Sequence, residues 1–275
     1  DDNSGQPSAK EVFDTTPYTI LVVDDNPDMT DFLKRTFEGY FKRIIIAGDG
    51  VEALQLVRSH VPDIIVSDVM MPRMNGYKLC KTIKEDINIS HIPVILLTAR
   101  DDRQSQISGY KNGADGYLSK PFEVEMLMEL IRNRLKNREY TKKRYLNAGL
   151  IPTPEESTIS LTDETFLIKL NSIIQENIEN SNLGIQFICQ EVGLGRSSLY
   201  NKLKALTGMG ANEYISKLRI EKAITLISGT DMPFSEIAEK TGFTTPSYFS
   251  TAFKQYTGET PSQYKERKKK GLADK

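Results

Sequence analysis

The sequence of 275 residues has few of the residues that build disulfide frameworks or metal centres, and it has no long apolar run. Its two cysteines, Cys80 and Cys189, each fall in a helix-like pattern, so we expect buried free thiols rather than a disulfide or a metal site. Its two histidines, His60 and His91, lie far in sequence from any second histidine or cysteine, which argues against metal binding by them. No run of about 18 apolar residues occurs, so we expect no membrane span and a cytoplasmic protein.

The N-terminus lacks both a methionine and the apolar core of a signal peptide. We therefore expect the sequence to be a fragment or a processed form whose natural N-terminal side is missing. Residues 1–17 are predicted to be a disordered tail. The length favours two domains in the rest of the chain.

Charge is distributed unevenly, although the formal net charge of the whole chain is only −1. Residues 1–140 contain 18 Lys and Arg against 22 Asp and Glu, a balance of −4, whereas residues 196–270 contain 13 against 7, a balance of +6. This asymmetry favours nucleic acid as a partner of the C-terminal half and a cation or a phosphate as a partner of the N-terminal half. Charge alone is weak evidence, because lysine-rich faces are often merely solvated.

Strand patterns and helix patterns alternate five times within residues 18–138, which we predict to be the first domain. The predicted strands are 19–23, 44–47, 64–68, 93–97 and 116–119, and the predicted helices that follow them are 29–37, 50–57, 76–86, 102–109 and 123–138. This alternation predicts an α/β doubly wound, five-stranded parallel sheet with helices on both faces.

The strand 64–68 is the most informative of the five, because it begins with three β-branched apolar residues and ends in a single acid, Asp68. A buried parallel strand of this kind delivers its carboxylate to the carboxyl edge of the sheet, where open α/β folds bind their ligands. The alternative is an exposed aspartate that only opens a turn.

Polar residues at the ends of three other strands bear on that choice: Asp24 and Asp25 follow the first strand, Thr98 the fourth, and Lys120 the fifth. Three carboxylates at one sheet edge repel one another unless a cation neutralises them, and an acidic site with oxygen ligands favours Mg²⁺. The hydroxyl and the ammonium group supply donors for phosphoryl oxygens. Together these groups predict a phosphoryl-transfer site with a carboxylate nucleophile.

Residues 18–138 resemble the receiver domain of two-component response regulators, which have a flavodoxin-like fold and accept a phosphoryl group from a histidine kinase. The resemblance makes Asp68 the phospho-acceptor and makes Asp24, Asp25 and the backbone carbonyl of Met70 the Mg²⁺ ligands together with it. Thr98 and Tyr117 match the family's switch residues. Lys120 matches the lysine that pairs with the phosphoryl group, and it precedes a proline that is commonly cis in the family. A phosphatase that forms an aspartyl phosphate is the rival interpretation, but it needs a second acid where this sequence has Met70. We therefore expect phosphorylation and dephosphorylation of Asp68 itself, and no enzyme that turns over an external substrate.

Residues 139–160 are predicted to be a linker, in which 142–144 extend the preceding helix and Pro152 and Pro154 exclude a helix interior. An all-α domain is predicted for 161–270, with Thr162 as the N-cap of its first helix, and a solvated tail for 271–275.

A pattern of short helix, glycine turn and second helix occurs twice in this domain, at 185–206 and at 234–256, around a connecting helix. This repeat indicates two helix-turn-helix units, whereas either unit alone could be a generic helical hairpin. Residues 165–268 also resemble the AraC/XylS family of DNA-binding domains; the matching stretches are 203–209, 214–223, 237–243, 247–254 and 258–264. Gly195 departs from the family, which usually has a serine cap there.

The resemblance implies two recognition helices that enter successive major-groove segments of DNA, about 34 Å apart. On the first helix, the resemblance assigns base-edge contacts to Ser197, Tyr200 and Asn201 and phosphate contacts to Arg196, Lys202 and Lys204. On the second helix, it assigns DNA contacts to Ser247, Ser250, Thr251 and Lys254. Lys268–Lys270 are predicted to be only a solvated tail.

These observations predict a phosphorylation-dependent transcription regulator that dimerises through the face of the helix 123–138 and binds promoter DNA. The histidine kinase is either a separate protein or fused upstream; receivers joined to this DNA-binding family also occur in hybrid sensors, some of which control carbohydrate utilisation. The alternative is a receiver that serves as a phosphate-independent interaction platform in a protein that binds DNA constitutively.

Overall fold

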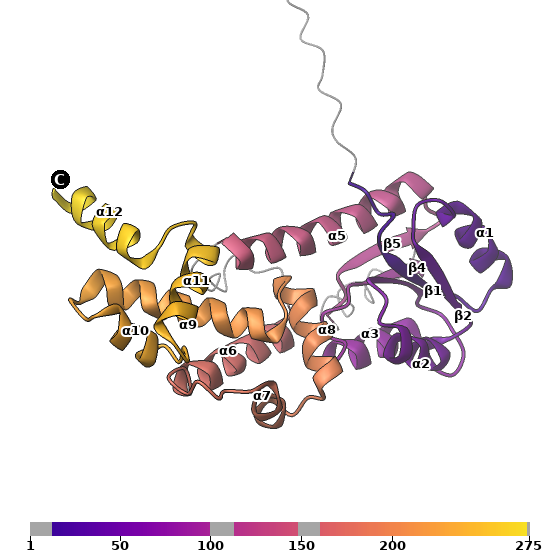
Figure 1. The fold of residues 1–275 in the computed structure, drawn as a ribbon. Coiled ribbons are helices and arrows are strands. Elements are labelled where there is room, and N and C mark those ends of the chain that lie inside the picture. The colour runs from indigo at the N-terminus through magenta and orange to yellow at the C-terminus, as the bar shows by residue number, and fades with distance from the viewer. Residues whose placement is uncertain (1–12, 100–112, 148–159, 274–275) are drawn as a thin grey trace, which may run out of the picture. The chain divides into compact units, whose positions relative to one another are not determined.

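The structure is a computed structural model that describes residues 13–99, 113–147 and 160–273 (Figure 1). The predicted helix 102–109 and most of the predicted tail and linker lie outside these residues. The chain divides into two compact units, Asp1–Tyr140 and Thr141–Lys275, which are described separately.

The first unit contains five strands, all parallel, in the order β2-β1-β3-β4-β5. They are β1 (Thr19–Val23), β2 (Arg43–Ala47), β3 (Ile64–Asp68), β4 (Val94–Ala99) and β5 (Gly116–Lys120). The predicted five-stranded parallel sheet is therefore confirmed. The chain passes from β1 to β2 on one side of β1 in the sheet and then from β2 to β3 on its other side. Ligands of such sheets bind where the strand order reverses, so a crevice is expected at the carboxyl ends of β1 and β3.

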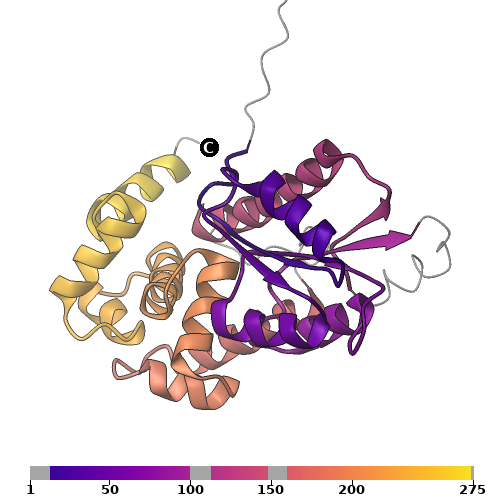
Figure 2. The ribbon, with the colours of Figure 1, turned by 90° about the vertical axis from the view of Figure 1, so that its right-hand side faces the viewer.

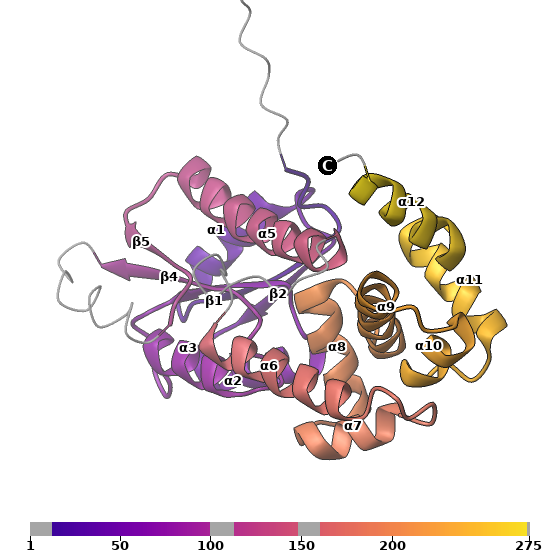
Figure 3. The same ribbon diagram turned by 90° about the vertical axis from the view of Figure 1, so that its left-hand side faces the viewer.

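Helices cover both faces of this sheet, with α1 (Pro27–Phe37) and α5 (Val124–Asn147) on one face and α2 (Gly50–His60) and α3 (Gly76–Glu85) on the other (Figures 2 and 3). The central strand β3 is buried along its whole length. Ile64 and Val66 pack on the α1–α5 side and Ile65 on the α2–α3 side, which explains why three consecutive residues of the strand are apolar.

The second unit is entirely helical in its described part. Its helices are α6 (Leu161–Glu176), α7 (Ile185–Val192), α8 (Arg196–Thr207), α9 (Ala211–Gly229), α10 (Phe234–Lys240), α11 (Pro246–Thr257) and α12 (Pro261–Ala273). The pairs α7–α8 and α10–α11 form the two predicted helix-turn-helix units, and α9 connects them (Figure 3). Phe249 and Phe253 of α11 are fully buried against residues of α9 and α10, in the core of the second helix-turn-helix.

Two predicted boundaries in this unit are wrong. The N-cap of α6 is Ser160 rather than Thr162, because the Ser160 side chain accepts a hydrogen bond from the Asp163 N–H and the helix already begins at Leu161. Lys268–Lys270 are exposed, as predicted, but they belong to α12 rather than to a tail, and the Lys268 ammonium lies 5.9 Å from the centre of the Tyr264 ring. In the part of the chain that the structure describes, no helix is long and apolar enough to cross a bilayer.

Candidate functional sites

The carboxyl edge of the sheet brings together two acids and a lysine from three strands. The Lys120 ammonium at the end of β5 lies 2.8 Å from Oδ2 of Asp24, which follows β1, and 2.5 Å from Oδ1 of Asp68, which ends β3. Both carboxylates are almost completely buried, with 3% of Asp24 and 7% of Asp68 exposed. The lysine therefore neutralises two acids that would otherwise repel each other in a poorly solvated place.

The loop after β3 holds the second oxygen of Asp68. The backbone N–H of Met70 donates a hydrogen bond of 2.8 Å to Asp68 Oδ2, while the Met70 side chain is 72% exposed. A Cβ at Gly76 would lie 2.2 Å from the Asp68 carbonyl oxygen, so only glycine lets α3 begin this close to the strand end. Lys120 thus holds one oxygen of the Asp68 carboxylate and the Met70 N–H holds the other.

The charge of Lys120 is stabilised at this position. Burial lowers the pKa of the Lys120 ammonium, but the hydrogen bonds and negative charges of Asp24 and Asp68 outweigh that effect, so the pKa is raised overall. The site consequently retains a permanent cation beside the Asp68 carboxylate.

The third predicted carboxylate is arranged differently. Asp25 is exposed, whereas its neighbour Asp24 is buried and accepts a hydrogen bond of 2.9 Å from the Asn26 N–H. Asn26 in turn caps α1. Within 13–99, 113–147 and 160–273, no group of three or more His, Cys, Asp or Glu side chains is assembled closely enough to hold a metal ion; the cation between the acids is the ammonium of Lys120.

Thr98 lies near the carboxyl end of β4, whereas Tyr117 is the second residue of β5. Thr98, on β4, is 1% exposed, and its buried hydroxyl makes no hydrogen bond to any residue that the structure describes. Leaving such a group without a partner costs about 1–3 kcal/mol, which favours a ligand oxygen as its partner. Tyr117, three residues before Lys120 on β5, is half-buried and packs against the α2–α3 side of the sheet.

The first predicted recognition helix, α8, exposes most of the side chains that were assigned to DNA. They are Arg196, Ser197, Tyr200, Asn201 and Lys204. Lys202 is the exception, because it is completely buried and forms an ion pair with Asp163 of α6. The prediction that Lys202 contacts a phosphate is therefore wrong.

The second recognition helix, α11, also presents a polar outer face. Ser247, Thr251 and Lys254 are exposed and Ser250 is half-buried. The hydroxyls of Ser250 and Thr251 donate to the carbonyls of Pro246 and Ser247, at 2.9 and 3.1 Å, which leaves their oxygens available as acceptors.

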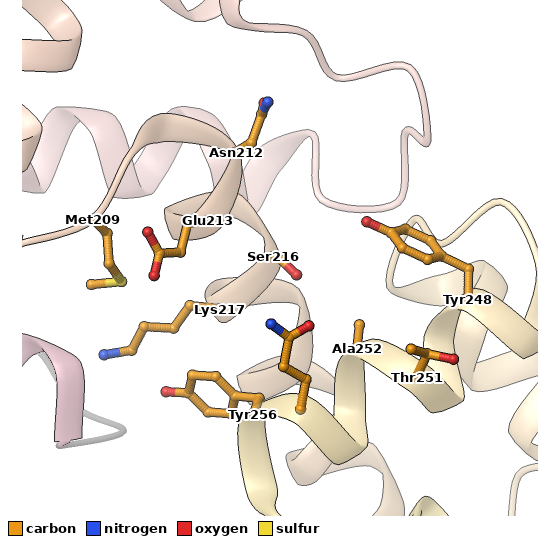
Figure 4. A pocket seen from close by; sticks show the side chains of 10 residues that line it. Met209, Asn212, Glu213, Ser216, Lys217, Tyr248, Thr251, Ala252 and Tyr256 are labelled. Atoms are coloured by element: carbon orange, nitrogen blue, oxygen red, sulfur yellow. The ribbon is translucent and has the colours of Figure 1, made fainter.

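A cavity of about 700 Å³ lies between α9 and α11 (Figure 4). Ser216 and Lys217 of α9 face Tyr248 and Tyr256 of α11 across it. Lys217 is 5% exposed and lies 3.7 Å from Glu221 Oε1, to which the Tyr256 hydroxyl donates at 3.4 Å. These contacts join the connecting helix to the second recognition helix.

Burial shifts the pKa values of Lys217, Glu221 and Tyr256. It lowers the pKa of Lys217 and raises that of Glu221, in each case more than the attraction between the two charges restores it. Burial and the Glu221 charge also raise the pKa of Tyr256.

Comparisons with known proteins agree with this geometry. A sequence profile of the response regulator receiver domain matches residues 20–132, and a profile of a helix-turn-helix domain, of the AraC type, matches residues 188–267. The chain is 36% identical over 165 residues to Response regulator MprA of Mycobacterium sp., which covers 55% of this chain and 70% of that protein. This chain belongs to the response regulators.

Other relatives of this response regulator are longer than the matched region. Histidine kinase P4 of Formosa agariphila is 41% identical over 249 residues, which is 90% of this chain but 18% of that protein. DNA-binding response regulator MtrA of Mycolicibacterium smegmatis is 36% identical over 136 residues, 50% of this chain and 58% of that protein. Among solved structures, a putative response regulator from Chloroflexus aurantiacus is 34% identical, with a TM-score of 0.42, over 44% of this chain and 99% of that one.

Sequence reasoning missed two features of the DNA-binding half of this response regulator. Tyr248 was not singled out, although it is 56% exposed on α11 and follows Ser247. The Lys202–Asp163 pair was also missed, although one signal was available: Lys202 follows the inward-facing Leu199 by three residues, which places it toward the same side of the helix.

Proposed function

We propose that this response regulator accepts a phosphoryl group from a histidine kinase on Asp68 and that phosphorylation controls its binding to promoter DNA. The observation that carries the proposal is the Asp68 carboxylate, oriented by Lys120 and by the Met70 N–H at the same sheet edge as the buried hydroxyl of Thr98.

In the transfer, an oxygen of Asp68 forms a bond to the phosphorus of a phosphohistidine as the phosphorus–nitrogen bond breaks. The electron pair of the broken bond leaves with the histidine nitrogen, which takes up a proton. Lys120 and Thr98 donate hydrogen bonds to the phosphoryl oxygens, so that the protein contributes position and charge neutralisation. Hydrolysis of the acyl phosphate on Asp68 resets the site, and we propose no other enzymatic activity.

The donor set suits Mg²⁺, which prefers oxygen ligands, keeps several waters and needs few carboxylates from the protein. The residues that would hold it are Asp24, Asp25 and Asp68 with the backbone carbonyl of Met70. Asp24 and Asp68 already converge on one cation, the Lys120 ammonium, which supports this assignment. When bound, the ion neutralises charge on the phosphoryl oxygens.

A phosphoryl group on Asp68 would give the Thr98 hydroxyl the partner that it lacks among the described residues. We propose that Thr98 moves toward it, that Tyr117 turns inward, and that the shift biases the face of residues 123–138, most of which belong to α5, toward a homodimer. The paired DNA-binding units then engage promoter half-sites.

At the DNA, we propose that Ser197, Tyr200 and Asn201 of α8 contact base edges, with Asn201 able to bond adenine through two hydrogen bonds. Arg196, Lys204 and Lys254 contact phosphates and so position the protein. The exposure of all of these side chains supports the assignment.

We further propose that the chain is the receiver and DNA-binding part of a cytoplasmic segment of a hybrid sensor, with the kinase fused upstream, and that it controls carbohydrate utilisation. The similarity of 90% of the chain to a portion of Histidine kinase P4 supports a hybrid.

Treatment with acetyl phosphate, or with beryllofluoride, in the presence of Mg²⁺ tests the switch. With acetyl phosphate, we expect mass spectrometry to find one phosphoryl group on Asp68. With either reagent, we expect light scattering to find more dimer and the protein to bind more tightly to a duplex that it selects from a random pool; Asp68→Asn should show none of these changes. If Asp68 is modified without any change in assembly or affinity, the receiver is a phosphate-independent platform. Turnover of p-nitrophenyl phosphate that Asp68→Asn abolishes would instead identify a phosphatase.

A further inference from the structure

Lys202 lies in the middle of the first recognition helix yet cannot reach DNA. Its side chain is completely buried, its ammonium is paired with Oδ1 of Asp163 on α6, and it lies 5.1 Å from the centre of the Phe166 ring, also on α6. Two neighbours on α8, Asn201 and Lys204, are exposed. The helix therefore points one lysine toward solvent and another into the unit.

The acid of this pair is held on its other side as well. Ser160 donates a hydrogen bond of 2.8 Å to Asp163 Oδ2, while its own oxygen accepts from the Asp163 N–H at 3.2 Å. Asp163 is 2% exposed. One carboxylate thus connects the cap of α6 to the centre of α8.

A buried ion pair is a poor way to gain stability, because apolar residues of similar volume often replace it without loss. It does demand a defined geometry, since either charge becomes costly when it is displaced from the other. The helix α6 that supplies the acid also lies outside residues 188–267, which match the helix-turn-helix family.

We propose that Lys202 is a positioning residue: its pairing with Asp163, which Ser160 orients, fixes α8 against α6 and thereby sets the DNA sequence selectivity of the first helix-turn-helix unit. Neither partner contacts DNA. The proposal rests on the proposed DNA recognition by α8 and adds that α6 fixes the orientation of that helix.

The test compares full-length variants on two duplexes, one that the wild-type chain recovers from a random pool and one scrambled duplex of equal composition. The double variant Lys202→Met with Asp163→Leu replaces the pair by apolar side chains and is expected to keep the wild-type melting temperature. Its ratio of affinities for the two duplexes should fall about tenfold, the loss expected when roughly one base contact is misaligned.

Lys204→Met is the matched control, because Lys204 is an exposed lysine on the same helix. It should weaken binding to both duplexes alike and reduce the slope of log affinity against log salt by about one, whereas the double variant should leave that slope unchanged. The conservative variant Lys202→Arg, which keeps the charge, should retain more of the selectivity than the double variant.

A folded double variant with wild-type selectivity overturns the proposal, as does a double variant whose salt slope falls like that of Lys204→Met. If the apolar double variant does not fold, the neutral double variant Lys202→Gln with Asp163→Asn takes its place. Failure of both variants to fold would show that the pair is required for folding rather than for the position of α8 on DNA, and this result also overturns the proposal. A wild-type chain that recovers no preferred sequence removes the proposed DNA recognition, and the positioning role with it.

Discussion

At the scale of the residue, a single ammonium group stands between two nearly buried carboxylates. Lys120 contacts both Asp24 and Asp68, and no other cation among the described residues lies within ion-pair distance of either acid. The same lysine therefore serves two states: it neutralises the acids before phosphorylation and, in the proposed mechanism, donates to the phosphoryl group afterwards.

Replacing Lys120 by Met is expected to lower the free energy of unfolding of the receiver by about 1–3 kcal/mol, because two buried carboxylates lose their counter-charge. The cost is below that of a fully buried pair, since 28% of the lysine side chain is exposed. Urea denaturation measures it, and the deficit should shrink as MgCl₂ is added. Lys136→Met, an exposed lysine on α5, is the control and should change stability by less than about 0.5 kcal/mol. Equal stability of the two variants would contradict the role of Lys120.

The cysteines differ in a way that the sequence did not reveal. Both were predicted to be buried, and neither forms a disulfide, but only Cys80 is buried, whereas Cys189 is partly exposed. Burial raises the pKa of the Cys80 thiol to about 12, although Lys84 lowers it in part. Because the thiolate is the reactive form, a thiol reagent at pH 8 should modify one cysteine per native chain and both after denaturation. Cys189→Ser should abolish the native reaction; rapid labelling of Cys80 in that variant would refute the assignment.

Single residues also mark the limit of prediction from the sequence. Asp68, Asp24 and Lys120 could be brought together in advance because parallel strands end at a common edge. The pairing of Lys202 with Asp163 could not, because Asp163 lies 39 residues away on another helix, and the spacing of Lys202 from Leu199 indicates only the side of α8 on which the lysine lies. Whether such a lysine is buried or exposed depends on a partner far away in the sequence rather than on the local pattern.

At the scale of the element, the strands were predictable because burial on two faces leaves a continuous apolar run, as in Ile64–Val66. Helix ends were less predictable, because a cap depends on which side chain reaches a free N–H. Ser160 rather than Thr162 caps α6 for that reason. The helix α5 was expected to pass 138 into the linker, and it ends at Asn147.

The turns of the two helix-turn-helix units pass through glycines of the same left-handed conformation but with different surroundings. Gly193 and Gly242 both have a φ of 72°. A Cβ on Gly242 would lie 2.2 Å from the Ile178 carbonyl oxygen and 2.9 Å from an Arg219 nitrogen, whereas a Cβ on Gly193 would meet nothing within 4 Å. The second turn thus has a steric requirement that the first lacks.

We therefore expect Gly193→Ala to destabilise the DNA-binding unit by about 1–2 kcal/mol, the cost of a left-handed residue with a Cβ. Gly242→Ala should cost at least twice as much, because the backbone at Ile178 must also move. Thermal and urea denaturation of the two variants measure the difference. Equal losses would show that the packing around Gly242 adjusts freely.

At the scale of the whole molecule, the two units carry opposite charge and separate cores. The receiver core lies on both faces of its sheet, and the second unit has its own cluster around Phe249 and Phe253. Units with cores of their own generally fold alone. In the proposed mechanism, regulation then depends on their being joined in one chain, since the proposed acceptor Asp68 lies in one unit and the two helix-turn-helix units lie in the other.

Dividing the protein between its two units should separate DNA binding from its control. A fragment of residues 148–275 should bind the selected duplex with an affinity that beryllofluoride and Mg²⁺ do not change, and a fragment of residues 1–147 should still be modified on Asp68. In the full chain, the same treatment should change DNA affinity by about 5–150-fold, the usual range of a coupling free energy of 1–3 kcal/mol. Full-length Asp68→Asn is the control and should not respond. Fluorescence anisotropy of a labelled duplex measures DNA binding by the fragment 148–275, by the full chain and by full-length Asp68→Asn, and mass spectrometry after acetyl phosphate treatment measures the modification of the fragment 1–147. A fragment 148–275 that binds no duplex would mean that the receiver is part of the DNA-binding structure, because its contribution would then be needed even without phosphorylation.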